Sequence, residues 1–296
     1  MKYQFAYLLL VCLFSLGLIS CEKDENDIDT RTLSLNISGL SDLGPDHTYE
    51  GWMVVDGDYF STGSFTVDSN GGLSQSQFQV HPEKLENAEA FVLTIESESD
   101  PDTEPSTVRL LAGNFSGNEA SLSIAHGNAI GTDLTSAKGK YILATPTDGQ
   151  DNTQENSGVW WLDPTNGPGR GLELPELGTG WKYEGWAVIN GIPVSTGKFT
   201  SVVDADESDH YSSTTASGPA FPGEDFLLNA PAGLDFPVNL AGRQVVISVE
   251  PDPDNHPSPF LLKPLVGNVP DPALDHTSYD MTNNALNSSP TGKAVR

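Results

Sequence analysis

A carboxylate two residues before a tryptophan occurs twice in this chain, as Glu50 with Trp52 and as Glu184 with Trp186. Such a carboxylate could act as an acid or a base, for example in a glycosidase. That chemistry needs two carboxylates that face one cleft at a set separation. The sequence identifies no second carboxylate, and duplicating the motif would duplicate half a site. We therefore interpret Glu50 and Glu184 as structural residues, turned by strand alternation to the face opposite their neighbours, where each caps a loop or pairs with a basic residue.

Signatures of other enzyme classes are absent from the sequence. There is no Gly-x-Ser-x-Gly elbow, no His-Glu-x-x-His, no Walker loop and no Gly-x-Gly-x-x-Gly after an expected strand. Only His126 and His276, among the histidines, occupy corresponding places in the two copies of a repeat, which favours a shared structural hydrogen bond over a metal site. We expect no enzymatic activity, no catalytic residue, no metal and no cofactor.

Two acidic loops and a group of tryptophans leave alternatives open. Residues 204–209 and 252–255 could supply oxygen ligands for calcium, but neither segment has EF-hand spacing, and acidic surface loops are common. The tryptophans between positions 160 and 186 lie close together in sequence and could stack sugars. Strand alternation favours their burial in a core instead.

The strongest pattern is an internal repeat around the two carboxylates. The block that starts at Tyr49 recurs at Tyr183 with the same spacing and without an insertion. Self-similarity over this many positions indicates two copies of one structural unit. The repeat-motif residues, all given structural roles, are Tyr49, Glu50, Gly51, Trp52, Gly57, Gly63, Tyr183, Glu184, Gly185, Trp186, Gly191 and Gly197.

Each copy of the repeat predicts a β-hairpin with an aromatic inner face. The dipeptides Asp-Gly at position 56 and Asn-Gly at position 190 accept the positive φ angles of a type I′ turn. In the returning strand, Gly63 and Gly197 mark a bulge or close packing against the tryptophan. The repeat therefore contributes an element of a β-sheet.

Strand signals dominate the rest of the chain. Residues 33–37 alternate strictly, and residues 91–95 and 245–249 are runs rich in β-branched residues between turn-forming residues. No long segment has apolar residues at helical spacing. We expect an all-β fold of two tandem immunoglobulin-like β-sandwich domains, with residues 203–231 forming a long surface loop.

The first residues predict export and lipidation. Lys2 and the apolar run at residues 5–19 form a signal peptide that is too short to span a membrane. The run ends in Leu-Ile-Ser before Cys21, which resembles the lipobox where bacterial lipoproteins are cut and acylated. An ordinary secretory signal with an incidental cysteine is the alternative. Since Cys12 leaves with the signal, no disulfide is expected, and a hydrophobic core must hold the exported chain.

These features give the expected domain organisation. It consists of a lipoprotein signal peptide at 1–20, an acidic tether at 21–31, a first β-sandwich repeat at 32–148 and a second at 149–296. The step Lys23-Asp24-Glu25 resembles the signal that sends Bacteroidota-type lipoproteins to the outer cell surface, and a spacer facing the periplasm is the alternative. We expect an outer-membrane lipoprotein of the cell envelope, periplasmic or surface-exposed.

The charge balance limits the partners. The chain carries 41 acidic and 14 basic residues, for a net charge of −27. Such a field repels phosphate backbones and anionic lipid, so nucleic acid is excluded as a default partner. Acidity is also a common solubility device, and it could favour cationic partners or divalent ions.

The second copy resembles a known family. Residues 183–199, the strand Val-Ile-Ser-Val-Glu-Pro that ends at Pro251, and Leu265-Val-Gly267 are similar to the extracytoplasmic C-terminal domain of anti-sigma-K factors. The resemblance implies a small β-sandwich. The first copy departs from the family pattern at residues 58–60 and after Glu96. The family's sigma-binding segment should precede the domain, but only a lipobox and a tether do so here, so the resemblance does not carry anti-sigma activity over.

The sequence favours a lipid-anchored envelope protein that acts as a non-enzymatic binding or interaction module, a sensor arm being one form of it. Its expected partners are the membrane, through the anchor, and another envelope protein. Two alternatives stay open. A carbohydrate-binding or carbohydrate-processing surface lipoprotein would be favoured by Trp181 and Glu184 exposed together in a groove. A structural spacer or adhesin stalk predicts no concave polar site.

Overall fold

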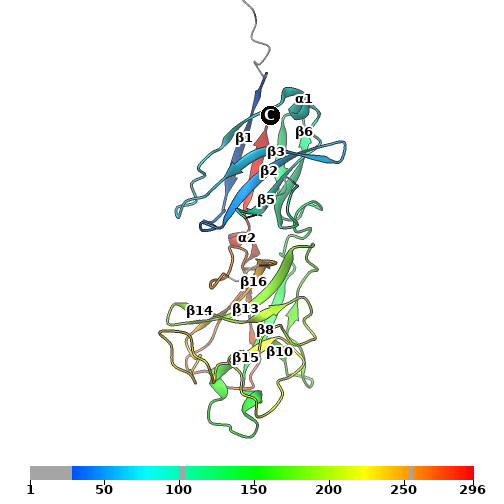
Figure 1. The fold of residues 1–296 in the computed structure, drawn as a ribbon. Helices are drawn as coiled ribbons and strands as arrows, with labels where there is room; N and C mark the ends of the chain where they lie inside the picture. Colours follow the sequence, from blue (N-terminus) through cyan, green and yellow to red (C-terminus); the bar gives the residue numbers. More distant parts are fainter. Residues whose placement is uncertain (1–28, 100–103, 254–255) are drawn as a thin grey trace, which may run out of the picture.

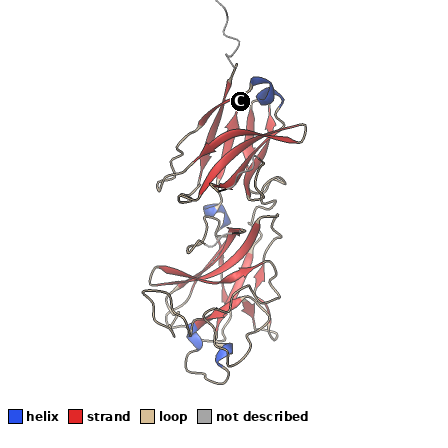
Figure 2. Cartoon of the chain, viewed as in Figure 1, coloured by secondary structure: helices blue, strands red, loops and turns tan. Residues whose placement is uncertain are grey.

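The computed structural model describes residues 29–99, 104–253 and 256–296, so the expected signal peptide, Cys21 and most of the tether lie outside the described residues. Strands make up nearly all of the regular structure (Figure 2), which confirms the all-β prediction. The helical segments are short: α1 (Pro82–Asn87), α2 (Ala285–Ser288), and the 3₁₀ turns η1 (Pro146–Asp148) and η2 (Glu155–Ser157).

An antiparallel sheet of eight strands forms the upper part of the molecule in Figure 1. Its two end strands contact each other, since the ring centroids of Phe65 and Phe78 lie 6.1 Å apart, so the sheet curls over its own core. The strand order is β3 (Asp58–Phe65), β2 (His47–Val55), β5 (Ala90–Ser97), β6 (Arg109–Ser116), β7 (Glu119–Leu122), β20 (Thr291–Val295), β1 (Arg31–Ser38) and β4 (Gln77–Val80).

Two further antiparallel sheets and one short ribbon form the lower part of the molecule in Figure 1. The first sheet has the order β14 (Ile192–Phe199), β13 (Trp181–Ile189), β16 (Gln244–Pro251), β17 (Leu265–Asn268) and β19 (Thr282–Asn283). The second has the order β12 (Leu172–Glu173), β8 (Lys138–Leu143), β9 (Gly158–Trp160) and β15 (Gly223–Asp225), with β18 (Tyr279–Asp280) also paired to β8. The ribbon pairs β10 (Leu162–Asp163) with β11 (Gly169–Arg170).

Both predicted hairpins are present, as β2–β3 and β13–β14. Their two-residue loops have positive φ at both positions, 54° and 88° at Asp56-Gly57 and 53° and 83° at Asn190-Gly191, as a type I′ turn requires. The strand register shifts after Gly51 and at the equivalent point of the second hairpin, which confirms the predicted bulge.

The expected aromatic inner face is wrong for the tryptophan. Tyr49 and Met53 point into the main core, whereas Trp52 packs with Val54 and Val92 in a small separate cluster. Strand alternation explains the difference, because positions three apart face opposite sides of a sheet. The tryptophan and the glutamate of the motif therefore share the outer face.

The last strand returns to the beginning of the fold. β20 lies between β1 and β7 in the eight-stranded sheet (Figure 1), while β8 pairs with β9, β12 and β18 in the lower sheets. Strand pairing thus joins segments from both expected repeat ranges. Arg296 fixes the chain end, because its Nη1 donates to the backbone oxygens of Leu85 (2.8 Å), Glu86 (3.0 Å) and Ala88 (2.8 Å) at the end of α1.

The segment expected to be a long surface loop, residues 203–231, is partly core. It contains β15, which pairs with β9, and the side chains of Glu224, Asp225 and Phe226 are fully buried. One apolar core runs through both parts of the molecule. Ile130, in the connection from β7 to β8, is one of the residues that join them. The Gly178 N–H also donates to the Ile130 oxygen at 2.9 Å.

Candidate functional site

The repeated motif forms a chain of hydrogen bonds on the outer face of each sheet. In the first copy, Trp52 Nε1 donates to Thr94 Oγ1 at 2.9 Å, and the Thr94 hydroxyl donates to Glu96. The same Glu96 carboxylate accepts the backbone N–H of Ser106 at 3.0 Å. The motif therefore holds the loop that connects β5 and β6.

The second copy repeats this chain with equivalent residues. Trp186 Nε1 donates to Ser248 Oγ at 2.8 Å, and the Ser248 hydroxyl donates to Glu250. The Glu250 carboxylate accepts the backbone N–H of Phe260, with distances of 2.9 Å and 3.1 Å to its two oxygens. A buried Glu250 thus anchors the β16–β17 loop to the sheet.

The two motif glutamates that could have been catalytic each accept a serine hydroxyl across their hairpin. Ser61 donates to Glu50, and Ser195 donates to Glu184. The same serine oxygens accept the backbone N–H of Gly63 (3.1 Å) and of the equivalent glycine in the second hairpin (3.0 Å). Since both glutamates bridge the bulge in the same way, these contacts are what a structural role would produce.

Tyr49 and Tyr183 complete the motif in a similar way. Each ring stacks on a phenylalanine of the partner strand, and each hydroxyl donates to a loop carbonyl, that of Ser41 at 3.0 Å and that of Pro175 at 2.7 Å. Burial raises the pKa of Tyr49 to about 12 and raises the pKa of Tyr183 further above its ordinary value. Both tyrosines therefore act as neutral donors that fasten a loop.

The tryptophans expected to be buried are buried, although only Trp161 and Trp181 belong to the main core. Trp160, Trp161, Trp181 and Trp186 are all buried, and Glu184 is only 6% exposed. The groove that would have exposed Trp181 together with Glu184 is not formed.

The corresponding histidines do not share a partner. His126 Nε2 lies 3.2 Å from Asn114 Oδ1, whereas His276 contacts the carboxylates of Asp275 (3.0 Å) and Glu155 (3.8 Å). The predicted common hydrogen bond is therefore wrong. Matching places in a repeat do not ensure matching contacts when the neighbouring loops differ.

The acidic segment at 204–209 is occupied by internal contacts. Asp206 accepts the N–H groups of Gly223 (2.8 Å) and Ser208 (3.1 Å), and Glu207 pairs with Lys182 at 2.8 Å. Asp252, from the other acidic segment, also lies 3.3 Å from Lys182. In the part of the chain that the structure describes, no three His, Cys, Asp or Glu side chains form a group that could hold a metal ion.

Half-buried Asp206 of that segment lies close to two fully buried carboxylates, Glu224 and Asp225. Burial raises the pKa of Asp206 and of Glu224 to about 7 and also raises the pKa of Asp225. Hydrogen bonds oppose the effect of burial: Asp225 accepts the Thr147 N–H (2.8 Å) and Trp160 Nε1 (2.7 Å). This cluster couples the stability of the lower sheets to pH.

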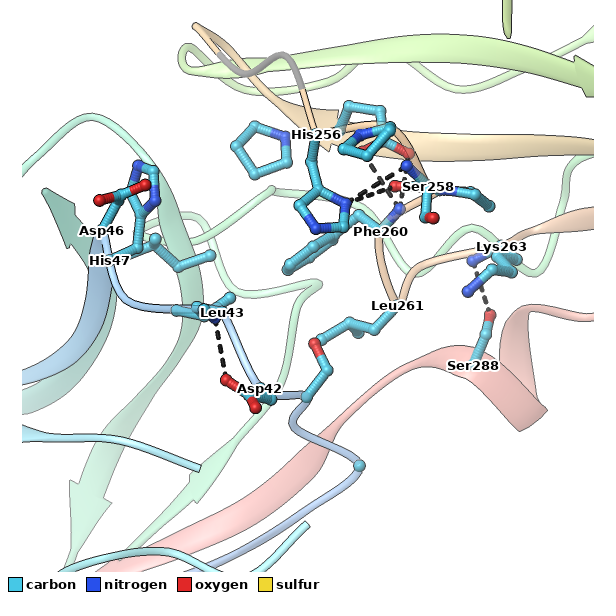
Figure 3. A pocket seen from close by; sticks show the side chains of 18 of the residues that line it. Asp42, Leu43, Asp46, His47, His256, Ser258, Phe260, Leu261, Lys263 and Ser288 are labelled. Atoms are coloured by element: carbon cyan, nitrogen blue, oxygen red, sulfur yellow. Dashed lines mark hydrogen bonds between the residues drawn. The ribbon is translucent and has the colours of Figure 1, made fainter. Parts of the chain in front are cut away.

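A cleft of about 740 Å³ lies where the upper and lower parts of the molecule meet (Figure 3). Gly39 and residues 41–46 of the β1–β2 loop, with His47 at the start of β2, form one wall. Residues 256–261 and Lys263 of the β16–β17 loop form the other. Ile95, Glu250, Pro251 and residues 287–289 complete the lining. The loop that the second copy of the motif anchors is thus the loop that shapes the cleft.

The cleft has an apolar middle and charged sides. Leu43, Phe260 and Leu261 belong to the apolar part of its lining, and the Phe260 ring is backed by buried Trp181 at a centroid distance of 5.9 Å. Asp42, Asp46 and His47 stand on the β1–β2 side, and His256 and Lys263 stand on the β16–β17 side (Figure 3). Burial lowers the pKa of the Lys263 ammonium, which the Glu250 carboxylate opposes only in part.

Sequence reasoning assigned no binding role to any charged residue of this cleft. Asp46 and Lys263 belong to loops that are far apart in the chain and carry no motif. The one available signal was the Glu-Pro step at Glu250, which marks the start of a loop rich in proline. It could have indicated a loop of fixed conformation, but not that this loop faces the β1–β2 loop across a cleft.

No protein-family model, no curated protein and no solved structure matches this chain. The resemblance to the anti-sigma-K domains stays a prediction. None of the helices in the described residues has the length and apolar character needed to span a bilayer.

Proposed function

We propose that this chain is a lipid-anchored, non-enzymatic binding module of the bacterial cell envelope, and that the cleft between its two parts is the binding site. The observation that carries the proposal is the composition of that cleft. An apolar centre with a few polar groups at its rim, in a volume of about 740 Å³, matches the usual build of a ligand site, which encloses roughly 300–1,000 Å³.

The position of the cleft supports a sensor arm. Its walls come from loops of both parts of the molecule, so an occupant would contact both parts at once. Binding energy would then favour one relative arrangement of the two parts, which is how a ligand shifts a conformational equilibrium. An envelope partner could respond to that change.

Two observations favour a binding module over the alternatives. Trp181 and Glu184 are buried, so they offer no aromatic surface for stacking a sugar. A plain spacer needs no concave polar site, yet the cleft combines charged side chains with an aromatic floor. A protein segment that carries both apolar and charged groups fits this lining better than a carbohydrate does.

Crosslinking in intact envelopes tests the binding function. An affinity tag placed in the exposed turn after Asn166 leaves Arg296 and its contacts with α1 undisturbed. We expect a discrete envelope protein to be recovered with the wild-type chain and lost when Ser258→Trp fills the cleft. Asn152→Trp, at an exposed position outside the cleft lining, is the matched control and should retain the partner. Equal recovery by Ser258→Trp would refute the cleft as the site.

Lipidation is tested separately at Cys21. We expect the wild-type chain to fractionate with membranes and to gain the mass of its acyl chains, whereas Cys21→Ser should be released in soluble form. Several acyl chains would be needed, because one chain binds a membrane only marginally. Membrane association that survives Cys21→Ser would contradict the anchor and leave the cleft test unaffected.

A further inference from the structure

Lys263 is unusual among the lysines of the described residues. No ion pair, side-chain hydrogen bond or aromatic ring contact joins its side chain to another described residue. The lysines with such a contact include Lys84, Lys138, Lys140, Lys182 and Lys293.

The lack of an ion pair at Lys263 is unexpected, because the chain has a large excess of acidic residues. Acidic residues outnumber basic residues by 41 to 14, so a lysine should find a carboxylate easily. The charge of Glu250 partly offsets the effect of burial on the pKa of Lys263, but that carboxylate already accepts hydrogen bonds from the Ser248 hydroxyl and the Phe260 N–H. An ammonium that is partly withdrawn from water without a partner is unfavourable, because its lost hydration is not replaced. An anionic occupant of the cleft would replace it.

The opposite wall carries the complementary charge. Asp42 and Asp46 are exposed on the β1–β2 side, and Leu43, Phe260 and Leu261 contribute apolar surface to the lining (Figure 3). A ligand that matched the whole cleft would carry an anion at one end, an apolar group in the middle and a cation at the other end.

We propose that the cleft binds the C-terminal end of a peptide chain, with its terminal carboxylate on Lys263, an apolar side chain against Phe260, and a basic side chain near Asp42 and Asp46. This inference rests on the proposed binding function and names the partner's chemistry. A carboxylate suits the site better than a phosphate does, because a second negative charge would be repelled by Asp42, Asp46 and Glu250. The basic side chain balances the acidic wall, and the apolar side chain gains by leaving water.

Two matched peptide pools test the proposal with the purified full-length mature chain. Each pool holds tripeptides with lysine first, leucine or phenylalanine second and every residue third. One pool ends in a free carboxylate, and the other ends in an amide. Peptides retained by the protein are identified by mass spectrometry, and their affinities are then measured one by one. We expect free acids to be retained and the matching amides to bind at least tenfold more weakly.

Substitutions assign the carboxylate to its partner. Lys263→Met should weaken the free acids at least tenfold and leave the amides unchanged, and Lys263→Arg should restore most of the affinity. Lys138→Met, which removes an exposed lysine outside the cleft, is the control. The double variant D42N/D46N should weaken peptides that begin with lysine but not their norleucine analogues. Urea unfolding of Lys263→Met checks the fold, and we expect no loss of stability, since no partner is left unpaired.

Each contrary outcome is decisive. Equal binding of acids and amides would overturn the role of Lys263, although the cleft would still be a binding site. No retention of either pool would overturn the peptide proposal, and the Ser258→Trp crosslinking experiment would then judge the binding function by itself. Loss of acid binding in Lys138→Met to the same degree as in Lys263→Met would show a general charge effect and would also overturn it.

Discussion

The carboxylate of Glu250 accepts the backbone N–H of Phe260 at 2.9 Å, and the carboxylate of Glu96 accepts the backbone N–H of Ser106 at 3.0 Å. Each acceptor lies ten residues before its donor, and each is reached from the motif tryptophan through one hydroxyl. Both copies of the repeat therefore use the same chain of hydrogen bonds to hold the loop that follows the strand. Among the described residues of the two loops, only those of the second loop line the cleft.

Because only the second loop has described residues in the cleft, equivalent substitutions in the two copies should differ in their effect on binding. Glu250→Ala and Glu96→Ala should each lower the free energy of unfolding by about 1–3 kcal/mol, because each leaves a buried hydroxyl and a loop N–H without an acceptor. Urea denaturation measures this effect. Only Glu250→Ala should also weaken binding of carboxylate-ended tripeptides, since it frees the loop that carries Phe260 and Lys263. Equal weakening by Glu96→Ala would contradict the link between loop and cleft.

The hairpins were predictable because their determinants are local. The turn dipeptides at 56 and 190 fix the two-residue loops, and the alternation of the flanking residues fixes the strands. The all-β class followed from the same kind of signal. Such patterns act over a few residues, so a single sequence can reveal them.

Features that depend on distant segments could not be predicted. Nothing in residues 291–295 shows that they lie between β1 and β7, since a short alternating strand fits many sheets. Burial of Glu224 and Asp225 within a polar segment has the same origin, because their partners Ser212 and Thr147 become neighbours only in the fold. The cleft is likewise a product of tertiary packing.

The motif glycines should fall into two classes when replaced by alanine. A Cβ at Gly185 would lie 2.2 Å from Thr196 Oγ1 and 2.5 Å from Trp161 Nε1, so we expect Gly185→Ala to cost about 3 kcal/mol or more. A Cβ at Gly191 would meet nothing within 4 Å, and only its positive φ of 83° opposes alanine, at about 1–2 kcal/mol. Thermal unfolding of both variants checks this order, and a reversed order would contradict the packing role of Gly185.

Removal of the C-terminal strand should destroy the eight-stranded sheet. β20 pairs with strands on both sides, and its Ala294 side chain is fully buried, so a chain ending at Pro290 would leave two unpaired edges and an open core. We expect this truncation to abolish the cooperative unfolding transition followed by circular dichroism. Arg296→Ala should cost only about 1–3 kcal/mol, by releasing the carbonyls at the end of α1. A truncated chain with a native unfolding midpoint would contradict this role.

Glu224 and Asp206, in the lower part of the molecule, make stability fall as the pH rises from about 4 to about 7. The pKa of Glu224 is raised from 4.5 to about 7, and that of Asp206 is raised from 3.8 to about 7, so the folded chain holds protons that the unfolded chain releases. Stability from these groups is therefore fully present below about pH 4, is lost between about pH 4 and 7, and stays low above pH 7.

The carboxylates whose pKa is lowered, those of Asp68, Asp151 and Asp163, titrate below the range from about pH 4 to 7. The Glu224 carboxylate faces the Ser212 hydroxyl and the Tyr211 N–H. Its acidic neighbours are Asp225, whose charge raises the pKa of Glu224, and Asp206, whose own pKa is also raised. The pKa of half-buried Asp163 is lowered to about 2 by hydrogen bonds from Thr165 and Lys140, so the stability that Asp163 contributes is lost only in acid below about pH 4. Titration between pH 5 and 8 therefore reports mainly on the buried cluster.

Glu224→Gln should remove a large part of that dependence. Glutamine keeps an oxygen for the Tyr211 N–H and an amide donor for Ser212 Oγ, while no charge has to be buried at high pH. At pH 8 we expect the variant to be more stable than the wild type by on the order of 1–3 kcal/mol, since one pKa unit corresponds to about 1.4 kcal/mol. At pH 4.5 the two chains should differ little. Urea midpoints across pH 5–8 measure the effect, and a wild-type slope that Glu224→Gln leaves unchanged would show that Glu224 is not its source.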